Sequence, residues 1–126
     1  MKKPLVSVVE DDRSFRESMR RLIRSLGYGV EAFASAADFL ASPRFAETDC
    51  LIADVHMPVM TGIELYRHLV DAERAIPTIL VTAYPNNADR VRALNDGVVG
   101  YLRKSDNEDD LKRCLRAALE PSRTNE

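Results

Sequence analysis

Acidic side chains gather directly after two short apolar runs of this 126-residue chain. Glu10, Asp11 and Asp12 follow the apolar run at residues 5–9, and Asp54 ends a second run. Carboxylates repel one another unless a cation lies among them, and Mg²⁺ prefers oxygen ligands while it keeps several waters. If both runs are parallel strands, the acids share the sheet edge where open α/β folds bind ligands. The pattern therefore predicts an acidic Mg²⁺ site.

Polar side chains also follow two later apolar runs. Thr82 ends the run at residues 78–82, and Lys104 follows the run at residues 99–102. A carboxylate such as Asp54 can attack a phosphoryl group and form an acyl phosphate. The charge of Lys104 and the hydroxyl of Thr82 could then stabilise the phosphoryl oxygens. Taken singly, each residue also has an ordinary explanation. Asp54 could be a turn residue, Thr82 a common strand residue and Lys104 a surface residue, and the acidic triplet could lie at a helix N-terminus. Their conjunction at successive strand ends favours a phosphoryl-transfer site.

The elements that must position these residues alternate between strand and helix patterns five times. This alternation predicts a doubly wound parallel sheet with helices on both faces. The strands are expected at residues 5–9, 30–33, 51–54, 78–82 and 99–102. The helix that starts near Gly62 is expected to turn four residues inward: Ile63, Tyr66, Leu69 and Val70. The helix over about residues 87–96 is expected to bury Val91 and Leu94 and to end at Gly97.

The composition is that of an ordinary globular domain, with 45% hydrophobic and 30% charged residues. We expect one domain over residues 1–120, and a polar tail or the start of a linker at residues 121–126. No apolar run is long enough for a membrane span and no signal precedes the first strand, which predicts a cytoplasmic protein. The net charge of −2 gives no overall attraction to nucleic acid, and Cys50 and Cys114 are expected to be reduced thiols.

Four segments in this order resemble the receiver domains of two-component response regulators. Residues 8–12 resemble the family's acid cluster, residues 51–58 and 60–62 its phosphoacceptor segment, residues 79–83 its switch segment and residues 100–104 its lysine segment. The resemblance covers residues 5 to about 119. It implies a CheY-like, flavodoxin-like fold, in which a five-stranded parallel sheet of order 2-1-3-4-5 lies among five helices.

The resemblance also implies a role for each residue of the site. Asp54 would accept phosphate from a phosphohistidine on a sensor histidine kinase or phosphotransfer protein. Glu10, Asp11, Asp54 and the backbone carbonyl of His56 would hold Mg²⁺, and Asp12 would be either a further ligand or only a helix cap. The domain would catalyse only its own phosphorylation and dephosphorylation and would not be an enzyme in the usual sense.

The same resemblance implies a switch that involves Thr82 and Tyr101. Phosphate on Asp54 would draw Thr82 toward it, and Tyr101 would fill the vacated space as the population shifts between two arrangements. The surface of the fourth helix, fifth strand and fifth helix would then control an output, with transcription as one option. A second copy of the chain and a downstream effector are further candidate partners, whereas a membrane and direct contact with nucleic acid are not expected.

Two departures from the family pattern leave alternatives open. Ser105 stands where the family usually has proline, which predicts a trans Lys104–Ser105 bond, and its capping-box spacing to Glu108 predicts an early start of the last helix. His56 stands where an aspartate-nucleophile phosphatase would want a second acid. That phosphatase and a receiver-like binding module that is never phosphorylated are the alternative functions. A nucleotide-binding domain is disfavoured, because no glycine-rich loop follows the first strand.

Overall fold

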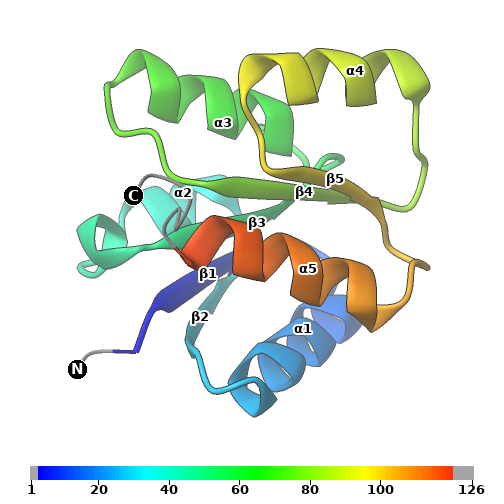
Figure 1. Ribbon diagram of the computed structural model, residues 1–126. Coiled ribbons are helices and arrows are strands. Elements are labelled where there is room, and N and C mark those ends of the chain that lie inside the picture. Colours follow the sequence, from blue (N-terminus) through cyan, green and yellow to red (C-terminus); the bar gives the residue numbers. More distant parts are fainter. Residues whose placement is uncertain (1–2, 121–126) are drawn as a thin grey trace, which may run out of the picture.

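The computed structural model describes residues 3–120 as a five-stranded parallel sheet between layers of helices (Figure 1). The strand order is β2-β1-β3-β4-β5, as predicted. The elements are β1 (Leu5–Val9), α1 (Arg13–Ser25), β2 (Gly29–Phe33), α2 (Ala36–Leu40), the short 3₁₀ helix η1 (Phe45–Glu47), β3 (Cys50–Asp54), α3 (Gly62–Asp71), β4 (Thr78–Thr82), α4 (Asn87–Asp96), β5 (Gly100–Arg103) and α5 (Glu108–Leu119). The tail predicted at residues 121–126 lies outside the described residues.

Two apolar clusters hold the layers together. Helices α1 and α5 cover one face of the sheet, where Ile23 and Leu115 are fully buried, and α2, α3 and α4 cover the other, where Phe39 and Leu65 are fully buried (Figure 1). Strands β1, β3 and β4 are buried along their whole length, because both of their faces are covered. Both cysteines are free thiols, as expected. No helix within residues 3–120 is long and apolar enough to cross a membrane.

The start of α5 differs from its prediction. Its N-cap is Asn107, whose side-chain oxygen accepts a hydrogen bond from the N–H of Asp110 at 3.2 Å. The predicted capping box of Ser105 and Glu108 is therefore wrong, and α5 begins at Glu108. Asparagine is as good an N-cap as serine, so the helix starts after the residue that the turn brings into position. The Lys104–Ser105 peptide bond is trans, as predicted.

Helix α4 is rotated relative to the face predicted for it. In α4, Val91 and Leu94 are 46% and 37% exposed, whereas the small Ala93 is buried. In α3, the prediction is confirmed for Tyr66 and Leu69, which are buried, and for Ile63, which is half-buried, but Val70 is 42% exposed. Neighbouring residues of a helix point about 100° apart, so two overlapping apolar stripes predict different buried faces. Packing against the sheet selects the stripe that contains Ala93 in α4.

Candidate functional site

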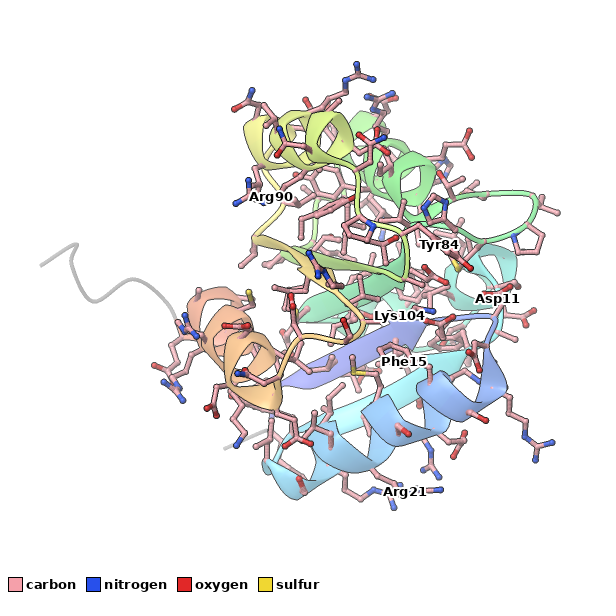
Figure 2. The ribbon with its side chains drawn as sticks, turned by 90° about the vertical axis from the view of Figure 1, so that its right-hand side faces the viewer. Asp11, Phe15, Arg21, Tyr84, Arg90 and Lys104 are labelled. Carbon is pink, nitrogen blue, oxygen red and sulfur yellow. The ribbon has the colours of Figure 1, made fainter. Side chains whose placement is uncertain are left out.

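The predicted site residues meet at the carboxyl edge of the sheet. Glu10 follows β1, Asp54 and Thr82 end β3 and β4, and Lys104 follows β5. The N–H of Lys104 donates to the carbonyl of Thr82 at 2.8 Å, which joins the last two of these strand ends. Figure 2 shows Asp11 and Lys104 on the same side of the molecule, above the first turn of α1. Parallel strands alone bring these distant residues together.

Three carboxylates form a compact acidic cluster within residues 3–120. Glu10, Asp11 and Asp54 each place one oxygen within 4.8 Å of the others. Glu10 and Asp54 are buried, with 1% and 4% exposure, whereas Asp11 is open to solvent. Asp12 does not join this group, because its Oδ1 accepts a hydrogen bond from the N–H of Ser14 at 3.0 Å and caps α1. The acidic triplet thus divides between a cluster and a helix cap.

Glu10 is the most strongly perturbed acid of the cluster. Its Oε2 accepts a hydrogen bond from the N–H of Asp12 at 3.0 Å, and its buried Oε1 lies 2.9 Å from the Nζ of Lys104. Burial raises the pKa of Glu10 to about 7; the Asp54 carboxylate adds to the rise, and the Asp12 N–H and Lys104 oppose it. A buried carboxylate needs a cation beside it, and its oxygens are also the ligand type that a hard cation prefers.

Lys104 supplies the positive charge of the site. Its Nζ lies 2.9 Å from Glu10 Oε1 and donates a hydrogen bond to Asp54 Oδ2 at 3.2 Å. Burial alone would lower the pKa of Lys104, but the two carboxylates outweigh this effect and the pKa is raised. The ammonium also lies 4.8 Å from the centre of the Phe15 ring, within range of a cation–π contact (Figure 2). The lysine is therefore charged and held on three sides.

Backbone groups fix the nucleophile candidate and the threonine. Asp54 Oδ1 accepts a hydrogen bond from the N–H of His56 at 3.1 Å, and Thr82 Oγ1 accepts one from the N–H of Tyr84 at 3.0 Å. The Thr82 hydroxyl therefore keeps its own hydrogen available to donate. The His56 and Tyr84 rings form an edge-to-face contact, with 6.0 Å between their centres. The role of the His56 carbonyl as a metal ligand stays a prediction.

Helix α3 approaches the end of β3 so closely that only glycine fits at its first position. A Cβ on Gly62 would lie 2.9 Å from the carbonyl carbon of Asp54 and 3.2 Å from a Leu80 methyl group. The Gly62 N–H donates to the carbonyl of Val55 at 3.2 Å, and Thr61 caps the helix. This contact closes the loop from Asp54 to α3 beneath the site.

The donor set suits a divalent oxygen-seeking cation. Glu10, Asp11 and Asp54 offer carboxylate oxygens of different exposure, which lie within 4.8 Å of one another. Mg²⁺ is bound by one or two carboxylates plus waters and phosphate oxygens, and the exposed side of Asp11 leaves room for them. The residues present therefore fit Mg²⁺, which the resemblance implies.

The chain matches one known family over most of its length. The family model described as the response regulator receiver domain matches residues 6–116. The chain belongs to this family. Receiver domains of this family typically bind Mg²⁺ at an acidic pocket, and the cluster of Glu10, Asp11 and Asp54 corresponds to such a pocket.

Curated relatives of the receiver domain are longer proteins. The domain is 37% identical over 121 residues to nodulation protein W of Bradyrhizobium diazoefficiens, covering 96% of this chain and 53% of that protein. It is 34% identical over 115 residues to response regulator protein TodT of Pseudomonas putida, covering 91% of this chain and 51% of that protein. The chain thus spans about half the length of these relatives.

Solved structures agree with the fold of the receiver domain. The response regulator StyR is 39% identical, with a TM-score of 0.84 over 94% of this chain and 60% of the StyR chain. The structure of FixJ-N is 29% identical, with a TM-score of 0.84 over 97% of this chain and 98% of the other. A receiver protein from Burkholderia phymatum is 40% identical, with a TM-score of 0.79 over 95% of this chain and 98% of the other.

Sequence reasoning missed two contributors to this edge of the domain. Phe15 of α1 is one of them, and nothing in the sequence shows that its ring faces Lys104. Asp106, which closes the turn that carries Lys104, lacks any sequence signal except its place in a polar loop.

Tyr101 is buried, as an inward-facing ring requires, and its hydroxyl accepts a hydrogen bond from the N–H of Asn86 at 3.2 Å.

Proposed function

We propose that this receiver domain accepts a phosphoryl group on Asp54 and passes the event to its surface as a switch. The observation that carries the proposal is the buried Asp54 carboxylate, which is paired with Lys104 at 3.2 Å and lies within 4.8 Å of two further acids. Buried ion pairs contribute weakly to the stability of a fold. A buried acid beside a cation and a cluster of metal-type ligands therefore points to a function.

The donor is a phosphohistidine, since sensor kinases and phosphotransfer proteins present phosphate to response regulators in this form. A carboxylate oxygen of Asp54 forms the new O–P bond, the N–P bond of the donor breaks, and the imidazole nitrogen that leaves takes up a proton from water. Lys104 directs its ammonium at the phosphoryl oxygens, and Thr82 can donate its hydroxyl hydrogen to them. The backbone N–H of His56 holds the other oxygen of Asp54 in place.

Mg²⁺ is the cofactor that we propose for the acid cluster. Glu10 and Asp11 would hold it together with Asp54, and the His56 carbonyl would be a further ligand. When bound, Mg²⁺ supplies positive charge that neutralises the carboxylates and the phosphoryl oxygens. Asp12 is left to cap α1.

The output surface is α4, β5 and α5, and Tyr101 connects the site to it. Its ring is buried and its hydroxyl holds the backbone at Asn86, the N-cap of α4. Movement of Thr82 toward a phosphorylated Asp54 would shift the balance between two positions of this ring and of α4. A second copy of the chain or a downstream effector would bind the altered surface. Since two relatives are named transcriptional regulatory proteins, transcription is the output that we propose.

The domain acts on itself and has no separate substrate to turn over. Incubation with phosphoramidate tests the proposal, with intact mass measured in the presence and absence of Mg²⁺. We expect a gain of one phosphoryl group that needs Mg²⁺, and no gain in Asp54→Asn. A wild-type protein that stays unlabelled at saturating donor and Mg²⁺ would contradict the proposal and favour an unphosphorylated binding module.

A further inference from the structure

The loop that carries Lys104 is a tight turn, and Asp106 closes it from both directions. The N–H of Asp106 donates to the carbonyl of Arg103 at 2.9 Å. In return, the N–H of Arg103 donates to Oδ2 of the Asp106 side chain at 3.0 Å. Lys104 and Ser105 are the two middle residues, so both ends of their segment are held by the same residue pair. The Asp106 side chain satisfies a backbone donor at the end of β5.

The position of this turn decides where the lysine ammonium can lie. The Lys104 backbone is tied to Thr82 of β4 at 2.8 Å, while its Nζ lies between Glu10 and Asp54 and its side chain is only 17% exposed. A lysine side chain has four flexible bonds and loses considerable rotamer freedom when its tip is fixed. A loosened turn would let the Lys104 backbone occupy several positions. From most of these positions the ammonium would not reach Asp54.

We propose that Asp106 is a positioning residue for phosphoryl transfer, which acts by fixing the turn that directs the Lys104 ammonium at Asp54. The inference rests on the proposed function. Asp106 itself lies in the exposed loop and does not touch the acid cluster, so it acts through Lys104. Reaction rates are sensitive to small displacements of charged groups in a site, and a turn that has lost its side-chain hydrogen bond permits them.

Initial rates of phosphorylation by phosphoramidate at saturating Mg²⁺ provide the first test. We expect Asp106→Ala to lower the rate about two- to tenfold, the range that the loss of one hydrogen bond supplies. Asp106→Asn keeps an oxygen that can accept from Arg103, so it should retain most of the rate. Asp109→Ala is the matched control, because it removes an exposed acid from the first turn of α5 without touching the turn. An equal loss of rate in this control would assign the effect to charge and overturn the proposal.

A double-mutant comparison separates positioning from a general loss of structure. If Asp106 acts through Lys104, adding Asp106→Ala to a Lys104→Ala protein should change the remaining rate very little. The same two- to tenfold loss in that background would show that Asp106 acts by another route, and the proposal would be wrong.

A second readout needs no phosphorylation. A small amine-acylating reagent, followed by peptide mass spectrometry, reports how freely Lys104 reacts relative to Lys112 of α5. We expect Asp106→Ala to raise the Lys104 to Lys112 ratio at least twofold, because the ammonium leaves its carboxylate partners more often. An unchanged ratio would overturn the positioning role. The reactivity ratio and the uptake of phosphate can fail separately. If Asp106→Ala raises the ratio but the wild-type protein takes up no phosphate, the positioning of Lys104 is supported and the proposed function is rejected.

Discussion

The Nζ of Lys104 lies 2.9 Å from Oε1 of Glu10, a buried carboxylate of the acid cluster. The ion pair offsets part of the repulsion in the acid cluster while no divalent ion is bound. Because a lysine and a metal ion would both draw on this oxygen, Lys104 and Mg²⁺ are expected to compete. The site is thus built to exchange one cation partner for another when the cofactor and the phosphoryl group arrive.

Replacement of Lys104 by methionine should strengthen Mg²⁺ binding. The variant keeps the aliphatic stem and removes the competing charge, so we expect the Mg²⁺ affinity to rise roughly tenfold, which corresponds to about 1.4 kcal/mol. Mg²⁺ titration followed by calorimetry measures the change. The same variant should be phosphorylated more slowly, because the positive charge near the phosphoryl oxygens is gone. Weaker Mg²⁺ binding in Lys104→Met would show that the lysine does not compete.

Asp11 and Asp12 are neighbours, but alanine substitutions at the two positions should have opposite signatures. Asp11→Ala removes an exposed member of the cluster, so we expect a large loss of Mg²⁺ affinity and little change in stability. Asp12→Ala removes the cap of α1, so we expect it to lose about 1 kcal/mol of unfolding free energy and to keep most of its Mg²⁺ affinity.

Metal titration and urea denaturation of both variants separate these effects. Asp12→Asn is a useful control, because asparagine caps helices as well as aspartate does and should restore stability. Equal losses of Mg²⁺ affinity in Asp11→Ala and Asp12→Ala would place Asp12 among the metal ligands and revise the site.

Gly62 should tolerate no side chain. We expect Gly62→Ala to lower the unfolding free energy by about 1–3 kcal/mol, because the added methyl group meets the backbone of Asp54 and has no space to relax. Gly29→Ala is the matched control, since a Cβ there meets its nearest neighbour, the carbonyl oxygen of Pro4, at an ordinary 3.5 Å. Urea denaturation of both variants provides the measurement. A similar loss of stability in both would show that the approach of α3 to β3 is not the limiting contact.

The carboxyl-edge cluster was predictable because strand ends fix its members. The positions of Glu10, Asp54, Thr82 and Lys104 follow from where four apolar runs stop, and parallel pairing then brings them together. What the sequence could not supply is the choice between alternatives of similar local energy. Asn107 and Ser105 are comparable as caps, and only the turn geometry selects Asn107.

The buried face of α4 was less predictable for the same reason. Helix α4 carries few large apolar residues, so periodicity pointed to Val91 and Leu94, but the helix buries Ala93. A small residue gives a weak hydrophobic signal and still permits the closest packing against the sheet. The contact between Lys104 and the Phe15 ring was equally hidden, because it joins two elements that are distant in sequence.

The location of the phosphoryl group is the most direct test of the claim that Asp54 is the phosphoacceptor. Borohydride converts an aspartyl phosphate into homoserine, so reduction of the phosphorylated protein followed by peptide mass spectrometry identifies the residue that was modified. We expect homoserine at position 54 and at no other acid, and we expect no homoserine when Mg²⁺ is withheld. Homoserine formed from Asp11 or Asp12, or a phosphoryl group carried on the exposed His56 with Asp54 unchanged, would contradict it.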